Sequence, residues 1–299
     1  VRCLGSTKGQ PAATAELEKL IAAEPDNHEF KFALAGLYQT QGKTAEAEAV
    51  FRRVIDSSKD EAAVNQARGA LATSVLGRGD KPAGVAVHGG SGVSFGVIEQ
   101  LRQARPQAKL LELVHRLDRE TSGILLVAKK RSALTHLQDQ FRERETGKTY
   151  LALVTGQWAP SNKVIDLPLH KYLQADGERR VRVTTADDPD GMRSITLVKV
   201  RQAVPARPLQ GLPAMTLLEV TIKTGRTHQI RVHLSHSGHP IVGDDKYGDF
   251  ELNRRMLRAG LKRMFLHAWR LGLTHPVTSE MMELKSELPA ELLPWVKFT

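Results

Sequence analysis

The sequence of 299 residues contains one cysteine, few aromatic side chains and no long apolar run. Because Cys3 stands alone, the chain can form neither an internal disulfide nor a cysteine-rich zinc site, and this usage is typical of a reducing compartment. No apolar run approaches the roughly 20 residues that span a bilayer, so we expect no contact with a membrane. The first residues also lack the apolar stretch of a secretory signal peptide. These absences predict a cytoplasmic protein.

Positive charge is in excess, but only in one part of the chain. The net charge is +10 at pH 7, from 43 Lys and Arg against 33 Asp and Glu. Residues 1–80 hold 10 basic and 11 acidic residues, whereas residues 81–299 hold 33 and 22. The second part therefore has the basic balance of a protein that contacts a phosphate backbone. Soluble enzymes can be equally basic, so charge alone does not identify the partner.

Residues 1–80 have the pattern of paired helices. Apolar residues recur at helical spacing within 26–61, and Gly42 separates the two halves of this stretch. Residues 61–83 resemble the first helix of a following pair, with a turn at Gly79 and Asp80. Such repeats bind proteins, so we expect either a site for a protein partner or a helical cap or spacer. The segment resembles a tetratricopeptide repeat, whose helix-packing positions are occupied by Leu34, Ala35, Tyr38, Gly42, Ala47 and Phe51.

From residue 81 onward, strand-like and helical segments intermingle without strict alternation. This irregular order predicts an α+β domain around a mixed or antiparallel sheet rather than a parallel βαβ fold. We therefore divide the chain into an all-α segment, 1–80, and an α+β domain, 81–299. The clearest expected strands are 124–130, 149–156, 179–185 and 215–225, and the clearest expected helices are 94–107 and 131–145.

The stretch HRLDRETSG, residues 115–123, sets a single carboxylate between two arginines. Asp118 lies between Arg116 and Arg119, and the loop runs directly into an expected strand that fixes its position. Two guanidinium groups in contact with an acid lower its pKa by about 1–3 units. We expect them to keep Asp118 ionised beside a nucleic acid, while the small residues that follow admit the nucleic-acid backbone. The alternative is a salt bridge with a purely structural role.

A second stretch, GKTYLALVTG, places Lys148 and Tyr150 on the same side of a strand. A tyrosine in this setting is usually part of a core, with its hydroxyl bonded to a neighbour. Its flat face could instead stack on a nucleic-acid base.

A third stretch, residues 224–249, contains a helix expected at 228–237. Thr227 can cap this helix and Gly238 can end it. Polar residues on one side of the helix could line a cleft, while apolar residues on another side face inward. The first group is His228, Gln229 and Arg231, and the second is Ile230 and Leu234.

Histidines recur every third residue in the same stretch, at His233, His236 and His239, and Asp244 and Asp245 follow. This recurrence raises the alternative of a metal-dependent hydrolase. The stretch lacks a stronger zinc signature such as H-E-x-x-H. We therefore expect no metal site here and favour hydrogen-bonding or phosphate-contacting histidines.

Together these stretches resemble the ribosomal-RNA pseudouridine synthases of the RluA/RluC type. The resemblance implies that family's catalytic domain with a central cleft, and large-subunit (23S) ribosomal RNA as partner. It also implies a reaction without a cofactor, in which the N1–C1′ bond of uridine breaks, the base rotates and C5 bonds to C1′. The runs that carry it cover most of 81–280 and include HRLDRETSGILLVAKKRSAL, KTYLALVTGQW, GRTHQIRVH, GHPIVGDDKYGD and FLHAWRLGLTHP.

The resemblance also implies roles for single residues. Asp118 matches the essential carboxylate, which either attacks C1′ or removes the C2′ proton. Tyr150 matches the tyrosine that packs on the base and serves the C5 proton step, and Arg231 matches the basic partner of the aspartate. Resemblance and local charge together give the expected RNA contacts, which are Arg116, Arg119, Lys148, Arg226, His228, Gln229, Leu266, Arg180 and Arg182.

The start of the second domain departs from the family pattern. An apolar strand and an Asn-Lys-Pro turn, often preceded by an S4 RNA-binding domain, are usual there, but this chain has Asp80, Lys81 and Pro82 after the helical repeat. We therefore expect the first strand and the S4 domain to be missing and one sheet edge to be open. This departure leaves a catalytically impaired RNA-binding or scaffold protein as the alternative function. We expect a monomer.

Overall fold

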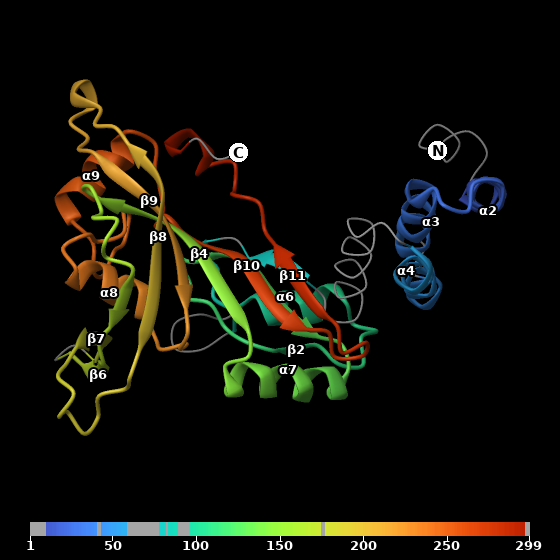
Figure 1. Ribbon diagram of the computed structural model, residues 1–299, viewed down its shortest axis with the longest axis horizontal. Coiled ribbons are helices and arrows are strands. Elements are labelled where there is room, and N and C mark those ends of the chain that lie inside the picture. The colour runs from blue at the N-terminus through green and yellow to red at the C-terminus, as the bar shows by residue number, and fades with distance from the viewer. Residues whose placement is uncertain are drawn as a thin grey trace.

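A computed structural model describes residues 10–40, 43–58, 78–81, 83–88, 96–174 and 177–296. Three helices form the N-terminal part of the described chain, and a large sheet flanked by further helices forms the rest (Figure 1). Within these ranges no helix combines the length and the apolar character needed to cross a membrane.

The N-terminal helices pack in sequence, with α3 against both α2 and α4. The helix-packing positions expected of a tetratricopeptide repeat are largely buried: Leu34, Ala35, Ala47 and Phe51 are each less than 5% exposed. Gly42 and residues 59–77 lie outside the described residues. The helices are α2 (Gln10–Ala23), α3 (His28–Thr40) and α4 (Thr44–Ser57).

The described part of the second domain is built on a mixed sheet of nine strands, which confirms the expected α+β class. Its order is β1-β3-β10-β4-β9-β8-β5, with β2 added to β3 and β11 to β10. Strands β3 and β10 are parallel, and the other pairings named in this sheet are antiparallel. The strands are β1 (Arg78–Lys81), β2 (Glu112–Leu113), β3 (Ser122–Ala128), β4 (Gly147–Thr155), β5 (Val164–Asp166), β8 (Ile195–Val204), β9 (Met215–Ile222), β10 (Leu266–Thr274) and β11 (Met281–Lys285).

The remaining described elements surround this sheet. A separate hairpin pairs β6 with β7, and α8 contacts β7 and β8, while α7 contacts β3 and β10. Two short 3-10 helices occupy Pro208–Gln210 and Leu293–Trp295. The other bounds are α6 (Val97–Ala104), α7 (Arg131–Glu143), β6 (Leu169–Leu173), β7 (Arg179–Val183), α8 (Gln229–His236) and α9 (Phe250–Arg258).

Strand β4 divides its side chains between two cores, as the two-residue period of a strand requires. Leu151 and Leu153 belong to a core shared with α9 and the C-terminal segment. Ala152 and Val154 face the opposite way, into a core that includes Ile230 and Leu234 of α8. Tyr150 has the same parity as Ala152 and packs against this second core. The strand period therefore places Tyr150 on the α8 side of the sheet.

The sheet edge near Lys81 is paired. Strand β1 runs antiparallel to β3, with Arg78 opposite Leu126 and Lys81 opposite Gly123. The expectation of an open edge is wrong over these residues, because a four-residue strand forms where none was expected. The predicted turn at Gly79 and Asp80 is also wrong, since both residues belong to β1.

Candidate active site

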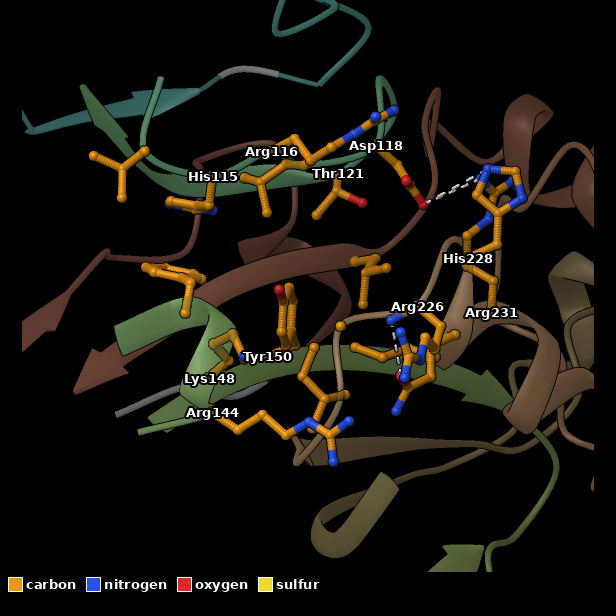
Figure 2. A pocket seen from close by; sticks show the side chains of 18 of the residues that line it. His115, Arg116, Asp118, Thr121, Arg144, Lys148, Tyr150, Arg226, His228 and Arg231 are labelled. Carbon is orange, nitrogen blue, oxygen red and sulfur yellow. Dashed lines mark hydrogen bonds and ion pairs between the residues drawn. The ribbon is translucent and has the colours of Figure 1, made fainter. Parts of the chain in front are cut away.

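Three segments that are distant in the sequence enclose one cavity of about 520 Å³ (Figure 2). The loop before β3 forms one wall, the start of β4 another, and the N-terminal end of α8 a third. All three residues expected to be catalytic line it, with six of the nine expected RNA contacts. The catalytic candidates are Asp118, Tyr150 and Arg231. The six RNA contacts that line the cavity are Arg116, Lys148, Arg226, His228, Gln229 and Leu266.

The carboxylate of Asp118 faces α8 rather than the arginines beside it in the sequence. Its Oδ2 lies 3.6 Å from Nη1 of Arg231 and 3.9 Å from Nε2 of His228. Arg119 turns away and pairs with Glu120, 2.9 Å from Nε to Oε1, and Arg116 lines the cavity. The expected pairing of Asp118 with its sequence neighbours is therefore wrong. Side chains of successive loop residues point in different directions, so Arg119 does not face Asp118. Arg231, far along the chain, supplies the guanidinium instead.

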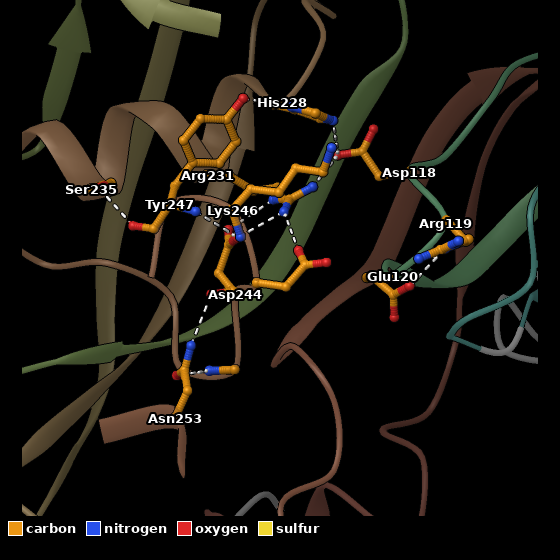
Figure 3. Close-up of polar contacts among 12 residues, drawn as sticks. Asp118, Arg119, Glu120, His228, Arg231, Ser235, Asp244, Lys246, Tyr247 and Asn253 are labelled. Carbon is orange, nitrogen blue, oxygen red and sulfur yellow. Dashed lines mark hydrogen bonds and ion pairs between the residues drawn. The ribbon is translucent and has the colours of Figure 1, made fainter. Parts of the chain in front are cut away.

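Arg231 is buried and held in a fixed orientation (Figure 3). Its Nε and Nη2 bind the two carboxylate oxygens of Asp244, each at 2.7 Å, and Nη2 also donates to Asp245 at 3.0 Å. Burial alone would raise the pKa of Asp244, but the bonds from Arg231 outweigh it and lower that pKa. A two-point pair of this kind fixes the plane of the guanidinium. The remaining nitrogen, Nη1, is therefore directed at Asp118.

His228 is the second group near Asp118, and it begins α8 in a left-handed conformation with φ of 52°. Its Nδ1 lies 2.8 Å from the hydroxyl of Tyr247. Burial lowers its pKa, so the imidazole is neutral at pH 7 and Arg231 is the cationic partner of the acid. The predicted cap at Thr227 is wrong, since His228 occupies the cap position and makes no side-chain cap bond. Gly238, with φ of 81°, follows the end of the helix as predicted.

Tyr150 and Leu266 form an apolar surface inside the cavity. Tyr150 on β4 pairs with Ala268 on β10, and Leu266 lies two residues earlier on that strand, on the same face. Burial, followed by the negative charge of Asp118, raises the pKa of Tyr150 well above its ordinary value. The phenol therefore stays protonated at neutral pH and presents a neutral ring.

A buried lysine, missed as a functional residue by the sequence analysis, anchors the Asp118 loop. Lys81 Nζ donates to the carbonyl oxygens of Arg119 and Thr121, both at 2.8 Å. The backbone N–H of Gly84 donates to the same Arg119 carbonyl at 2.9 Å. Burial lowers the pKa of Lys81 to about 8. In the sequence Lys81 stands out only as part of the Asp80, Lys81 and Pro82 run, and the two carbonyl groups that accept its hydrogen bonds lie about forty positions away in the chain.

Of the small residues after Asp118, Thr121 lines the cavity, whereas Ser122 and Gly123 pack within the protein. Ser122 is buried, and its Oγ contacts Nδ1 of His267 at 2.9 Å and Nη2 of Arg263 at 2.7 Å. Gly123 has φ of 109°, and a Cβ placed there would lie 2.3 Å from the carbonyl oxygen of Ala268. Ser122 and Gly123 therefore allow β3 to lie close against β10. The expectation that these two residues admit a nucleic-acid backbone is wrong.

Gln229, expected to contact RNA, has its polar atoms engaged within the protein. Its Oε1 accepts from Thr224 at 2.7 Å and from the Arg226 backbone at 3.1 Å. Its Nε2 donates to the Ile195 carbonyl at 2.9 Å and to Thr196 Oγ1 at 3.0 Å. A side-chain amide has two donors and one acceptor oxygen with two lone pairs, and all are used here. The bonds tie α8 to β8, which is a structural role.

The two β7 arginines that were expected to contact RNA, Arg180 and Arg182, do not line the cavity. Arg180 is half-buried and donates to Glu178 and to the Lys246 carbonyl, at 2.9 and 2.6 Å. Arg182 is exposed, with its guanidinium 5.6 Å from the ring centre of Tyr172. Of the two, only Arg182 presents its charge on an exposed surface.

The histidines of the third stretch do not converge on one point. His233 is buried and lies 2.9 Å from Thr196 Oγ1 and 3.0 Å from the Leu167 carbonyl. His239 contacts the Thr155 carbonyl at 2.7 Å. These two histidines therefore serve as hydrogen-bonding residues within the fold, at separate places.

His115 begins the Asp118 loop and joins it to β3. Its ring stacks on Phe141 with centroids 4.8 Å apart, and its Nε2 accepts a hydrogen bond from the Leu126 N–H at 3.1 Å. Burial lowers the pKa of His115 to about 4. The neutral imidazole is thus the form that holds the loop.

This lowered pKa predicts an acid-sensitive contribution to stability. Between about pH 4 and 6.5 the unfolded chain binds more protons at His115 than the folded chain, so stability falls as pH falls through that window. His115→Gln, whose amide oxygen can accept the same bond, removes the effect. From pH 7 to 4.5 we expect the original protein to lose about 2 kcal/mol more unfolding free energy than the variant, measured by urea denaturation. Equal losses would contradict the assignment.

Comparison with known proteins finds matching family models and similar relatives for the two parts of the chain. A family model described as RNA pseudouridylate synthase matches residues 79–236, and one described as tetratricopeptide repeat matches residues 11–71. The ribosomal large subunit pseudouridine synthases C of Pasteurella multocida and Escherichia coli K12 are 50% and 52% identical over 213 and 211 residues. These alignments cover 71% and 70% of this chain but 62% of each relative, so the chain spans less than two thirds of their length.

Two solved human structures are also similar. RNA Pseudouridylate Synthase Domain Containing 1 aligns with a TM-score of 0.56 and 28% identity, over 70% of this chain and 78% of that protein. RNA Pseudouridylate Synthase Domain Containing 4 aligns with a TM-score of 0.54 and 26% identity, over 72% and 87%.

Proposed function

Because the chain belongs to the RNA pseudouridylate synthase family, we propose that it isomerises uridine to pseudouridine in 23S ribosomal RNA. The observation that carries this proposal is the meeting of Asp118, Tyr150 and Arg231 in one cavity. They come from a loop, a strand and a helix, and each matches the family's motif at its own position. The names of the relatives, which act on the large ribosomal subunit, support the choice of RNA.

In the proposed reaction the target uridine first leaves its stack, because the sugar of a paired or stacked nucleotide is out of reach. Extrusion costs a few kcal/mol, which contacts in the cavity must offset. Asp118 then either bonds to C1′ as the N1–C1′ bond breaks, or removes the C2′ proton to drive the same cleavage. The freed uracil rotates and C5 bonds to C1′, while the Asp118–C1′ bond breaks in the first route or Asp118 returns the proton to C2′ in the second. C5 then loses its proton and N1 gains one. Product and substrate have the same atoms, so no other reactant is consumed.

Arg231 orients Asp118 and places a positive charge beside its carboxylate in both routes. Its Nη1 stands 3.6 Å from the carboxylate, while Asp244 fixes the rest of the guanidinium. A preorganised cation in a partly buried cavity stabilises negative charge without reorganising during the reaction. Asp118 is therefore ready as a nucleophile or base before RNA arrives.

Tyr150 and Leu266 would hold the extruded uracil. Because the pKa of Tyr150 is raised, its phenol is neutral and can pack on the base. The raised pKa argues against a phenolate that takes the C5 proton. Arg116 lines the cavity beside Asp118 and would hold the extruded position, and Arg226 and Lys148 would meet nearby phosphates. Arg182 on β7 would add a contact outside the cavity, and Arg119 would lie near the RNA next to its partner Glu120.

The wider organisation of the chain follows the same proposal. We divide the chain near residue 80, between the tetratricopeptide-like helices and the catalytic domain, and assign the helices to a protein partner. Since one chain supplies every group at the candidate site, we propose that it acts as a monomer, which gel filtration at assay concentration tests. The proposed ribosomal RNA substrate also supports the proposal that the protein acts in the cytoplasm.

Release of tritium from 23S ribosomal RNA labelled at C5 of uridine tests the function directly. We expect release that is proportional to enzyme, with pseudouridine found in the digested RNA by chromatography. RNA binding without release would instead support the alternative of an impaired RNA-binding or scaffold protein. Activity lost in a strong chelator would point to metal chemistry and contradict the proposal.

A further inference from the structure

Arg144 ends α7 in a conformation that suits other residues better. Its φ and ψ are 65° and 28°, in the left-handed region, at the position directly after the helix. Glycine or asparagine normally occupies such a position because a larger side chain is strained there. An arginine at this position is therefore less stable locally than a glycine, which indicates that its side chain has a further role.

The side chain of Arg144 lines the cavity, on the wall that lies across from the Asp118 loop (Figure 2). Lys148, at the start of β4, lines the same wall, with its ammonium 5.4 Å from the ring centre of Phe141. Burial, followed by the positive charge of Arg144, lowers the pKa of Lys148. Two cations thus face the cavity close enough to repel each other.

Acidic partners are absent from this pair, although acids are near. Arg142, two residues before Arg144, forms ion pairs with both Asp139 and Glu143. Across the described ranges, by contrast, neither Arg144 nor Lys148 makes an ion pair with a carboxylate. Of the three cations that line the cavity here, Arg142 is therefore paired with acids, and Arg144 and Lys148 make no ion pair within the described residues.

We propose that Arg144 and Lys148 form a binding site for a backbone phosphodiester of the RNA strand that carries the extruded uridine. The site deepens the proposed function and rests on it. A nucleotide inserted between Tyr150 and Asp118 keeps its strand at the mouth of the cavity, where a phosphate can meet these cations. An arginine fork binds phosphate at two points, and the lysine adds a point charge. Arg144 acts in binding and positioning and does not touch the reacting atoms.

The substitution Arg144→Gly separates binding from folding. Glycine relaxes the left-handed conformation, so we expect an unchanged or higher melting temperature. The affinity of the full chain for a 23S ribosomal RNA transcript, measured by filter binding, should fall about tenfold. The slope of log K against log salt concentration should become shallower by about one. In the tritium assay KM should rise with kcat nearly unchanged, because the contact is made equally before and during the reaction.

Arg258→Gln is the control variant, since it removes an exposed arginine at the end of α9 that does not line the cavity, and it should leave RNA affinity and salt slope unchanged. If Arg144→Gly binds RNA with the original affinity and slope, or lowers the melting temperature, the phosphate site is wrong and Arg144 is structural. An equal loss in Arg258→Gln would also overturn it, by showing a general charge effect. Filter binding detects bound RNA whether or not its uridine is isomerised, so RNA binding without pseudouridine would contradict only the proposed function.

Discussion

Replacing Asp118 by Asn is expected to lower kcat for tritium release by at least about 10⁴-fold, because the amide can neither bond to C1′ nor take the C2′ proton. The variant should fold normally. Asp118 is 29% exposed and its closest cation is 3.6 Å away, so the pair contributes about 1 kcal/mol or less to stability. Affinity for the RNA should be equal or higher, because a negative charge leaves a site that faces a polyanion.

The expected result is thus a folded, RNA-binding and inactive protein, established by circular dichroism, filter binding and tritium release on one preparation. Glu120→Gln is the matched control, since this acid lies in the same loop and pairs with Arg119 away from α8. Turnover of Asp118→Asn at the rate of that control would exclude Asp118 as the essential carboxylate. Loss of RNA binding together with activity would show that the substitution had damaged the site as a whole.

The three residues that we propose as catalytic could be assigned to their elements from the sequence, because each lies in a run with its own local pattern. Asp118 precedes an apolar strand, Tyr150 lies on a strand, and Arg231 lies on a short helix. Local periodicity and resemblance are enough to place each of them on its element. The structure then brings the three elements together.

The pairing of these residues could not be predicted in the same way. The sequence puts Arg116 and Arg119 nearest to Asp118, but the cation that meets it is Arg231, more than a hundred positions away. The packing of α8 against the sheet decides which side chains face Asp118. Proximity along the loop does not. Arg119 likewise pairs with Glu120 rather than Asp118 because of the directions that these side chains take.

Residues that hold the loop were hidden for a related reason. Lys81 acts through two carbonyl oxygens, and backbone acceptors carry no signal in a sequence. Gly123 has a role that depends on how closely β10 approaches β3, a distance set by the whole sheet. The misreading of the small residues as an opening for RNA came from considering the loop without the strand that covers it.

The second large effect concerns Asp244, which touches no reacting atom. Asp244→Asn removes the charge from a fully buried partner of Arg231 and leaves a buried guanidinium with only Asp245 and Asp118 beside it. Breaking such a pair from one side costs about 3 kcal/mol or more of unfolding free energy. A displacement of about 1 Å in a positioned catalytic group can lower kcat about 10²-fold. Urea denaturation and tritium release should therefore both change.

Two further variants separate these effects. Asp245→Asn removes the more exposed acid, whose side chain is 54% exposed, and should cost less than about 1 kcal/mol with little loss of kcat. The double change Asp244→Asn with Arg231→Met takes away the unpaired charge as well, so it should regain stability relative to Asp244→Asn alone. Its activity should stay low, because nothing then orients Asp118. If activity returned with stability, Asp244 would matter only for folding, and the chain of contacts from Asp244 through Arg231 to Asp118 would have no part in the reaction.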